Sequence, residues 1–337
     1  GGTGGHVIPA VNFGNYIIEK GHTCYLFIDN RGKKYTSNFK GQVKIINSSH
    51  LAQNFLGKLK SICILLYGLI QSIFYLLNIR PSKCIAFGSY ASFMPLMILT
   101  IFNFFGLTQI YLHEQNSVMG KVNKIFSRFA NKIFLNFEIT KKLGNKYINK
   151  SYFAGSPKNH TFNYTSRSIK IKENKIKKIF VSGGSQGAFN LNYSICNILI
   201  KIHEELNGNL EIVMQCPFNQ IKDMEKIFKE KNIKYEIKQY YNDILKRLYE
   251  TDVLITRAGA GTINDVINTQ TPTIFIPLPK SADNHQLNNA RYLEDLHASI
   301  IINEKKLNEE ESYLIIKNLI KNTELQVNLI NNLQKIN

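Results

Sequence analysis

Short apolar runs alternate with longer amphipathic stretches along the whole chain. In the first half, this pattern predicts an amphipathic helix near residues 9–20 and strands at residues 23–28 and 109–112. In the second half it predicts four further strands, at residues 179–182, 211–215, 253–256 and 273–276. Strands that alternate with helices are typical of parallel sheets covered by helices on both faces. We therefore predict an α/β chain with two Rossmann-like, doubly wound parallel sheets.

A glycine-rich loop stands ahead of a helical pattern in each half of the chain. GGTGGH occupies residues 1–6 and GGSQG occupies residues 183–187. Glycine lets backbone N–H groups approach a phosphate closely, and the N-terminus of a following helix adds partial positive charge. Neither loop fits GxGxxG or the P-loop pattern, so we predict neither a dinucleotide site nor a P-loop ATP site. Two such loops in corresponding places predict two sheets that face a common cleft.

The length of 337 residues predicts about two domains. Turn residues at 155–157 predict the boundary between them. We expect an N-terminal domain over residues 1–155, a C-terminal domain over residues 156–322, and a final helix over residues 323–337 that packs back on the first domain. A strand normally precedes a glycine loop of this kind, so we expect the first strand of the N-terminal sheet to be missing from this sequence.

The chain carries 42 Lys and Arg against 24 Asp and Glu, a net charge of +18. This excess predicts an anionic partner, such as a pyrophosphate substrate or a lipid surface, although a bias toward Lys, Asn and Ile codons explains it equally well. The basic residues are spread out and no nucleic-acid motif is present, which argues against nucleic acid. Five widely spaced cysteines indicate a reducing cytosol and predict neither a disulfide framework nor a metal site.

Residues 61–77 are apolar almost throughout. A membrane span needs about 20 such residues, and this run is slightly shorter, contains Gln71 and Ser72, and has basic residues on both sides. It is therefore interpreted as a buried helix or as an apolar patch on a bilayer surface, in preference to a span. Residues 91–107 are also apolar but contain Pro95 and Asn103, and we expect a core helix there.

Polar residues that follow predicted strands are the candidates for chemistry. HEQN at residues 113–116 follows an apolar strand, where side chains should reach the crevice at the carboxyl end of the sheet. RAGAGTIND at residues 257–265 offers a carboxylate for a ribose diol, and DNHQLNNA at residues 283–290 adds His285 and Gln286 for sugar hydroxyls. Ser185 is suited to a phosphate oxygen or to a helix N-cap. His6 is suited to general-base catalysis, because a neutral imidazole accepts a proton near neutral pH.

Six motifs resemble, in order and spacing, those of the MurG family, over nearly the whole chain. They are GGTGGHVIPA, FGSYASFMP, HEQNSVMGKVN, GGSQGAFNLN, RAGAGTIND and PLPKSADNHQLNNAR. Members of that family have the GT-B fold and transfer N-acetylglucosamine from UDP-GlcNAc to muramyl-peptide pyrophosphoryl-undecaprenol. The resemblance implies a hexosyltransferase of peptidoglycan synthesis that converts lipid I to lipid II. It further implies inversion at the anomeric carbon, a β-1,4 linkage to the 4-hydroxyl, no covalent intermediate, no cofactor and no dedicated metal.

The resemblance also implies a role for single residues. Asn116 and Gln286 would hold the donor sugar, Ser185 would meet the α-phosphate, and the backbone of Tyr241 would read the uracil edge. Ribose and sugar would be held by Ala260, Gly261, Thr262, Ile263, Asn264 and Asp265. Thr3, Gly4 and Gly5 count among the residues around the donor and, with Gly88 and Ser89, would cradle the pyrophosphate of the acceptor. His6 is the candidate catalytic base.

The sequence departs from the family pattern at two binding positions. Asp265 stands where the family has Glu, and Asn159 stands where it has Arg, with Lys158 adjacent. Two other functions stay open: a GT-B relative that glycosylates diacylglycerol, and a non-catalytic nucleotide-sugar-binding protein. We expect a peripheral location on the cytoplasmic face of the bacterial inner membrane, held to its anionic surface by residues 61–77 and by Lys side chains.

Overall fold

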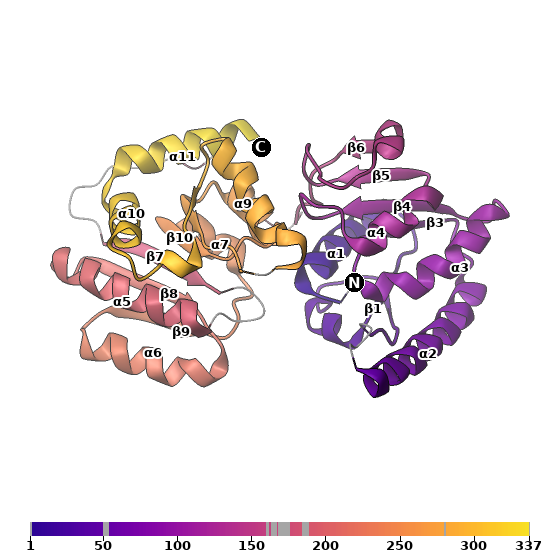
Figure 1. Cartoon of the computed structure of the whole chain (residues 1–337), viewed down its shortest axis with the longest axis horizontal. Coiled ribbons are helices and arrows are strands. Elements are labelled where there is room, and N and C mark those ends of the chain that lie inside the picture. Colours follow the sequence, from indigo (N-terminus) through magenta and orange to yellow (C-terminus); the bar gives the residue numbers. More distant parts are fainter. Residues whose placement is uncertain are drawn as a thin grey trace. The chain divides into compact units, whose positions relative to one another are not determined.

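The computed structural model describes residues 2–49, 54–159, 162, 167, 176–183, 189–279 and 281–336. The chain divides into two compact units, Gly1–Thr161 and Phe162–Asn337 (Figure 1). Each unit is built from parallel strands connected by helices, so the predicted fold of two Rossmann-like domains is confirmed.

The C-terminal unit contains a six-stranded parallel sheet. Its strands are β7 (Lys177–Ser182), β8 (Leu210–Gln215), β9 (Lys234–Lys238), β10 (Val253–Thr256), β11 (Thr273–Phe275) and β12 (Ile300–Ile301). Their order in space is β12-β11-β10-β7-β8-β9, which places β7 at the centre and is the doubly wound arrangement. The four strands predicted in this half are confirmed. The sequence pattern did not predict β9, whose KYEIK alternates charged and apolar residues at the edge of the sheet, or the two-residue β12.

Helices cover the two faces of this sheet. They are α5 (Phe189–Glu205), α6 (Phe218–Glu230), α7 (Ile244–Glu250), α8 (Ala260–Thr269), α9 (His285–Asp295), α10 (Glu310–Lys321) and α11 (Thr323–Ile336), with the 3-10 helices η5 (Ala282–Asn284) and η6 (Glu304–Lys306). Apolar side chains of β7, β8, β10 and β11 form the core with those of α5, α6 and α10. Helix α11 contacts α8 and α10 of its own unit. Its contact with the N-terminal unit stays a prediction.

The N-terminal unit contains two parallel sheets. One pairs β1 (Tyr25–Ile28) with β2 (Gln42–Ile45), and the other has the order β3 (Lys83–Ala86), β4 (Gln109–Glu114), β5 (Lys132–Leu135), β6 (Ser151–Phe153). In the C-terminal unit the first strand, β7, lies between β8 and β10. Among the described residues no strand takes the matching place between β1 and β3. The expected strand ahead of the first glycine loop stays a prediction.

Helices and 3-10 turns connect these strands. They are α1 (Gly4–Glu19), η1 (Asn30–Tyr35), α2 (Phe55–Ile79), η2 (Tyr90–Ser92), α3 (Phe93–Phe104), α4 (Lys121–Phe126), η3 (Ser127–Phe129) and η4 (Asn145–Lys150). Helix α1 begins at Gly4, five residues before the predicted start, because the glycines of the first loop already form its first turn. Weak helix propensity hides such a start from the sequence pattern.

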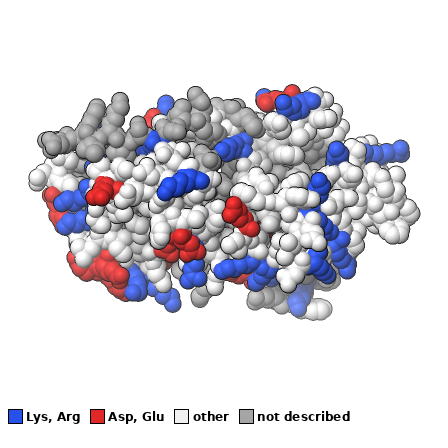
Figure 2. Space-filling model, turned by 90° about the horizontal axis from the view of Figure 1, so that it is seen from above, with Lys and Arg blue, Asp and Glu red and all other residues white. Residues whose placement is uncertain are grey.

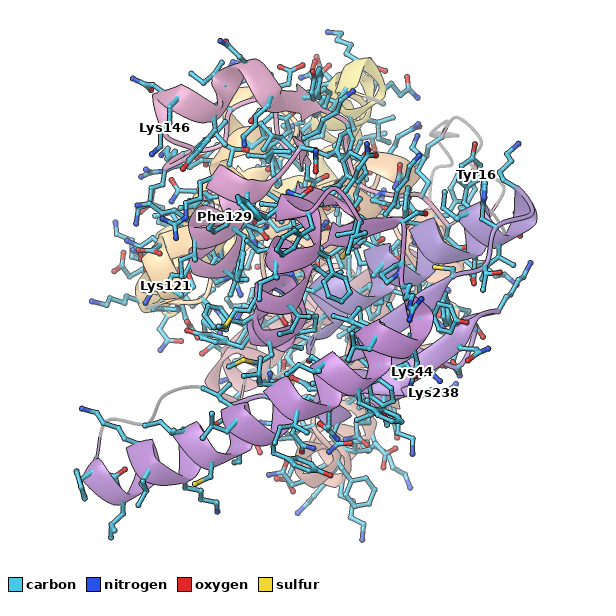
Figure 3. The ribbon with its side chains drawn as sticks, turned by 90° about the vertical axis from the view of Figure 1, so that its right-hand side faces the viewer. Tyr16, Lys44, Lys121, Phe129, Lys146 and Lys238 are labelled. Carbon is cyan, nitrogen blue, oxygen red and sulfur yellow. The ribbon has the colours of Figure 1, made fainter. Side chains whose placement is uncertain are left out.

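Helix α2 packs mainly with small residues toward the protein, together with Leu76 near its end, and most of its large apolar residues face outward. Ser61, Gly68 and Ser72 are buried, and the Ser72 hydroxyl donates to the Gly68 carbonyl at 2.7 Å. The helix exposes the side chains of Phe55, Leu56, Leu59, Ile62, Leu66, Tyr67, Ile70, Ile73, Phe74 and Leu77 (Figure 3). The alternative of a buried helix is therefore wrong. By length and composition α2 is the one helix in the described part of the chain that could cross a membrane.

Helix α3 is only half buried, which corrects the expectation of a core helix. Met94, Leu96 and Leu99 pack against the sheet, whereas Met97 and Ile101 face outward. The turn after the helix continues this exposed side with Phe104, Phe105 and Leu107. The pattern could not resolve the two faces because nearly every residue of the helix is apolar. We call the exposed residues of α2 and α3 and of this turn the α2–α3 surface.

Gly68 fixes the position of α2 against the loop that follows β2. A Cβ on Gly68 would meet the carbonyl oxygen of Asn47, and Gln71 Oε1 accepts the Asn47 N–H at 2.9 Å one turn further on. We predict that Gly68→Ala lowers the free energy of unfolding by about 1–3 kcal/mol, as overpacking does. Ala normally stabilises an exposed helix position by up to about 1 kcal/mol over Gly, so the sign of the change is diagnostic. Urea unfolding of the two proteins measures it, and equal or greater stability of the variant would refute the close contact.

Candidate functional site

Loops at the carboxyl ends of the strands form the candidate site of the N-terminal unit. In parallel α/β sheets these ends carry the ligand crevice. η1 follows β1, the turn Phe87–Ser89 follows β3, and Gln115 and Asn116 follow β4. β1 contacts η2, which follows β3, so these ends lie together. The first glycine loop and the start of helix α1 lie at the same edge, because His6 contacts the loop after β3 and Gly4 packs against η1.

His6 lies in the first turn of α1 and its imidazole is held by the loop after β3. Its Nδ1 lies 2.6 Å from the carbonyl oxygen of Phe87. A carbonyl oxygen can only accept, so Nδ1 carries the hydrogen and donates it. In the neutral ring the other nitrogen, Nε2, is then the one that can accept a proton. The fold thus selects the tautomer that a general base requires.

The turn after β3 holds two successive residues with positive φ. Gly88 has φ of +80°, and Ser89 has φ of +73° with ψ of 159°, a region that non-glycine residues avoid. Hydrogen bonds from the Ser92 hydroxyl to the carbonyl oxygens of both residues support this backbone, at 2.7 and 2.8 Å. A Cβ on Gly88 would lie 3.5 Å from His6 Cε1 and 3.4 Å from Asn123 Nδ2. His6, Gly88 and Ser89 are therefore brought together, as expected.

The HEQN stretch is largely structural, which corrects the expectation that its side chains reach an open crevice. His113, Glu114 and Gln115 are each at most 3% exposed. Strand β4 extends to Glu114, two residues further than predicted, and carries the side chains inward. Asn116 alone of the four is partly exposed and keeps its candidate role.

Glu114 organises the loop that carries Asn116. Its Oε1 accepts the Asn116 N–H at 3.0 Å, and its Oε2 accepts from the Gly120 N–H and from Asn123 Nδ2, each at 2.9 Å. Burial raises the pKa of this carboxyl above its usual range, against the opposing effect of these hydrogen bonds. The Asn123 amide also lies beside Gly88, where a Cβ would be 3.4 Å from its Nδ2. Through Asn123, Glu114 therefore links the loop that carries Asn116 to the turn after β3. No sequence pattern predicted this role of Glu114.

His113 is a neutral support behind the same loop. Its ring stacks on Phe87 with centroids 5.2 Å apart, and its Nε2 lies 2.8 Å from the Gly155 carbonyl oxygen. Nε2 must donate there, so Nδ1 accepts from the amide of Gln115. Burial lowers the pKa of His113 to about 4, so the ring carries no charge near neutral pH.

In the C-terminal unit the N-terminal half of α8 presents Asp265 and open backbone. Ala260 and Ile263 are buried and anchor the helix, while a Cβ on Gly261 would meet no atom within 4 Å. Asp265 is partly exposed; partial burial raises the pKa of its carboxyl to about 7, and no hydrogen bond to this carboxyl is present among the described residues. A partly desolvated carboxylate with open acceptor positions fits a group that accepts hydrogen bonds from ligand hydroxyls.

Arg257 is a structural residue, which the motif did not distinguish from the candidate binding residues beside it. Its Nη1 donates to the Ile276 carbonyl and, with Nη2, to both carboxylate oxygens of Glu304 at 3.0 and 2.8 Å. The ion pair with Glu304 connects the end of β10 to η6 after β12, and the bond to the Ile276 carbonyl connects it to the end of β11. Gln286 supports the loop after β11, because its Oε1 accepts the Leu278 N–H at 3.0 Å. This bond leaves the amide hydrogens of Gln286 for another acceptor.

Tyr241 has its side chain in the core. The hydroxyl donates to the Glu236 carbonyl at 3.1 Å, the ring packs edge-on against Phe180, and the Arg247 guanidinium lies 4.4 Å from its centroid. Only the backbone of Tyr241 can therefore meet a ligand. Ser185 lies outside the described residues. The roles of Lys158 and Asn159 stay predictions.

Two family models match the chain. The glycosyltransferase family 28 N-terminal domain matches residues 1–135, and the glycosyltransferase family 28 C-terminal domain matches residues 178–333. These matches correspond to the two compact units.

Two relatives that match the chain over nearly its whole length share one name. The UDP-N-acetylglucosamine–N-acetylmuramyl-(pentapeptide) pyrophosphoryl-undecaprenol N-acetylglucosamine transferase of Rickettsia canadensis is 33% identical over 336 residues, covering 99% of this chain and 93% of that protein. The protein of the same name from a Wolbachia of Drosophila simulans is 32% identical over 337 residues, covering 100% and 90%.

Solved structures agree in fold. The crystal structure of Acinetobacter baumannii MurG has a TM-score of 0.69 at 22% identity and covers 99% of this chain and 95% of that one. The glycosyltransferase of kitacinnamycin has a TM-score of 0.66 at 12% identity and covers 98% and 92%. At these identities the likeness concerns the fold alone.

The unpartnered carboxyl of Asp265 generates a prediction on stability. A folded-state pKa of about 7 against an unfolded value of 3.8 means that ionisation opposes folding. This penalty is absent below pH 4, grows between pH 4 and 7, and is complete above pH 7. We predict that Asp265→Asn raises the free energy of unfolding by about 1–3 kcal/mol at pH 8 and changes it little at pH 4. Asp295→Asn, on an exposed helix end, is the control and should show no such dependence. Urea unfolding at both pH values measures the difference, and a less stable Asp265→Asn at pH 8 would contradict it.

Proposed function

The chain belongs to glycosyltransferase family 28, and on that premise we propose that it transfers N-acetylglucosamine from UDP-GlcNAc to the 4-hydroxyl of muramyl-peptide pyrophosphoryl-undecaprenol. The observation that carries this proposal is the pairing of His6 with the strained turn Gly88–Ser89 at one sheet edge. A base that accepts a proton and a backbone cradle for an anion are the two groups that a phosphorylated alcohol acceptor needs. The relatives from Rickettsia canadensis and Wolbachia are named for N-acetylglucosamine transfer to N-acetylmuramyl-(pentapeptide) pyrophosphoryl-undecaprenol, and the chain matches 93% and 90% of their lengths.

The N-terminal unit is proposed to bind the acceptor. Thr3, Gly4 and Gly5 lie at the N-terminus of α1, where unpaired N–H groups and the helix dipole favour an anion. The Thr3 hydroxyl makes no capping bond to the helix and is available to a phosphate oxygen. These groups and the turn Gly88–Ser89 would hold the pyrophosphate, and His6 beside them would face the acceptor hydroxyl.

The C-terminal unit is proposed to bind the donor. Asp265 would accept hydrogen bonds from the ribose hydroxyls, and the open backbone at Gly261 lets the ribose and sugar lie close to α8. Gln286 offers its amide hydrogens to the sugar, and Asn116 from the loop after β4 is proposed to bind the same sugar. Backbone groups at Tyr241 would bond to the uracil. Ser185 would meet the α-phosphate.

The reaction proceeds by a single displacement under this proposal. The acceptor hydroxyl oxygen attacks the anomeric carbon as the bond to the UDP oxygen breaks, which inverts that carbon. His6 Nε2 takes the hydroxyl proton, and its position in the fold favours this because Nδ1–H stays on the Phe87 carbonyl. Helix N-termini and hydroxyl donors would stabilise the negative charge of the departing UDP, without a dedicated metal.

A membrane-facing role is proposed for the α2–α3 surface. A soluble helix normally buries its large apolar residues, whereas α2 buries Ser61, Gly68, Ser72 and Leu76 and exposes most of its large ones. Phe55 is 81% exposed and Phe104 is 85% exposed. An exposed apolar patch of this extent is typical of a binding surface, and a lipid-linked acceptor is met at a bilayer. We therefore place this surface against the inner membrane.

Charge supports the same orientation. The N-terminal unit has 19 Lys and Arg against 4 Asp and Glu, a net charge of +15, while the C-terminal unit has 23 against 20, a net charge of +3. Figure 2 shows acidic side chains mostly over the C-terminal unit on the face in view. A codon bias would act on both units alike, so it does not explain the difference. Attraction of the N-terminal unit to anionic lipids explains the difference in net charge.

The transfer assay with a His6 variant tests the proposed activity. We expect the parent protein to move labelled N-acetylglucosamine from UDP-GlcNAc to a short-chain lipid acceptor. His6→Ala should lower kcat by about 10²–10⁴ if Nε2 is the base, with the KM for UDP-GlcNAc little changed. His22→Ala, an exposed histidine of the same unit, is the control and should retain the parent rate. A His6→Ala enzyme within threefold of the parent kcat would return His6 to a structural role.

Vesicle binding tests the membrane role. The protein should co-sediment with anionic vesicles at low salt and be partly released by high salt, because salt screens surface charge. Replacing Leu66 and Ile70 by Gln should weaken partitioning into the vesicles about tenfold or more. More than half of each side chain is exposed in the protein and would be buried in the bilayer. The control replaces Leu296 and Leu314, exposed leucines of the C-terminal unit. Equal partitioning of the two variants would contradict the proposal, and a need for detergent at high salt would indicate a span.

A further inference from the structure

The segment η1 carries a cluster of basic residues at the edge of the sheet where the acceptor is proposed to bind. It follows β1 directly and reads NRGKKY. Asn30, Arg31, Lys33 and Lys34 line an open hollow of about 520 Å³. None of these residues belongs to a motif of the family resemblance, and none has a role in the site described above.

η1 packs directly on the first glycine loop. A Cβ on Gly2 would lie 2.7 Å from Arg31 Nη2, and a Cβ on Gly4 would lie 3.2 Å from the Tyr35 ring. Lys34 Nζ in turn lies 5.0 Å from the centroid of that ring. The basic side chains therefore stand beside the backbone that is proposed to hold the pyrophosphate.

The positive charge of this segment is only partly neutralised. Asp29 is buried and accepts from Arg31 Nε at 3.1 Å and from the Ser48 hydroxyl at 2.9 Å. Burial would raise the pKa of Asp29, but these bonds lower it below its usual value, so Asp29 and Arg31 form an ionised pair. Lys33 and Lys34 are exposed, and within the described part of the chain neither forms an ion pair. Two cationic charges remain for a ligand.

We propose that Lys33 and Lys34 form a second oxyanion subsite for the acceptor, beside the pyrophosphate cradle. This rests on the proposed function. Its ligand is an anionic oxygen group of the acceptor, either a carboxylate of the pentapeptide that the names of the relatives specify or a phosphate oxygen that the glycine loop leaves exposed. Lysine suits either group, because its ammonium is a point charge without directional demands.

The location distinguishes this subsite from the general basic surface. Charges that serve only a bilayer can lie on any part of the unit, such as Lys146 on η4 (Figure 3). Lys33 and Lys34 follow the carboxyl end of a parallel strand, and Lys34 lies over the Tyr35 ring that packs on the glycine loop. η4 instead leads into the amino end of β6, and Lys132 begins β5, so both stand at the opposite edge of their sheet.

Equilibrium binding of a short-chain acceptor to the full chain, without donor, tests the subsite. The test variant is Lys33→Gln with Lys34→Gln, and the control is Lys132→Gln with Lys146→Gln, which removes the same charge. We expect the Kd for the acceptor to rise about 5- to 30-fold in the test variant only, as two exposed ion pairs allow. The Kd for UDP-GlcNAc should not change in either variant.

A second acceptor with amidated peptide carboxylates identifies the anionic group. If the lysines bind carboxylates, amidation raises the Kd of the parent protein and abolishes the difference between parent and test variant. If they bind phosphate, the difference persists with the amidated acceptor. A test variant that binds both acceptors within twofold of the control overturns the subsite. The binding measurement contains no donor and does not depend on transfer. If the transfer assay shows no activity, the proposed function is refuted, and the binding data still decide whether Lys33 and Lys34 bind the acceptor.

Discussion

The parallel arrangement of strands determines where chemistry can occur in this protein. Backbone hydrogen bonding between parallel strands forces their carboxyl ends to one edge, and the chain must leave each strand there through a loop. Ser89 and Asn116 lie at this edge of the N-terminal unit because they follow β3 and β4, and the contact of His6 with the Phe87 carbonyl brings the start of α1 to it. In the C-terminal unit the same constraint brings the start of α8 and the loop after β11 together. In the proposed function the acceptor binds at the edge of the N-terminal sheet, and most groups that hold the donor lie at the edge of the C-terminal sheet.

The acidic residues at these edges separate scaffold from ligand site. Glu114 is fully enclosed and its oxygens already accept from Asn116, Gly120 and Asn123, so it holds a loop in place. Asp265 is partly exposed, and its carboxyl has no hydrogen-bond partner among the described residues. A carboxylate with all its bonds made stabilises a fold, whereas a partly desolvated one without partners costs stability and is retained where a ligand completes the bonds. The difference supports a donor site on α8.

The sequence pattern predicted the strands of the C-terminal sheet because buried parallel strands are short apolar runs. It missed β9, which alternates charged residues, and it placed the start of α1 late because glycines hide a helix. The motifs identified candidate site residues but not where their side chains point. The side chains of His113, Glu114 and Arg257 are buried. Helix α2 shows the same limit, because hydrophobicity gives length and not which face is covered. Packing against Asn47 decides that face, and this contact is not visible in the sequence.

Hydrogen exchange of the full chain with each substrate alone tests most directly whether each unit binds its own ligand. With UDP-GlcNAc, we expect slower exchange at Ala260–Thr269 and at the loop that leads to Gln286. With a short-chain lipid acceptor, we expect slower exchange at the start of α1, at η1 and at the turn Phe87–Ser89. Protection of the α1 start by UDP-GlcNAc with no change in α8 would contradict the division of the two substrates between the two sheets.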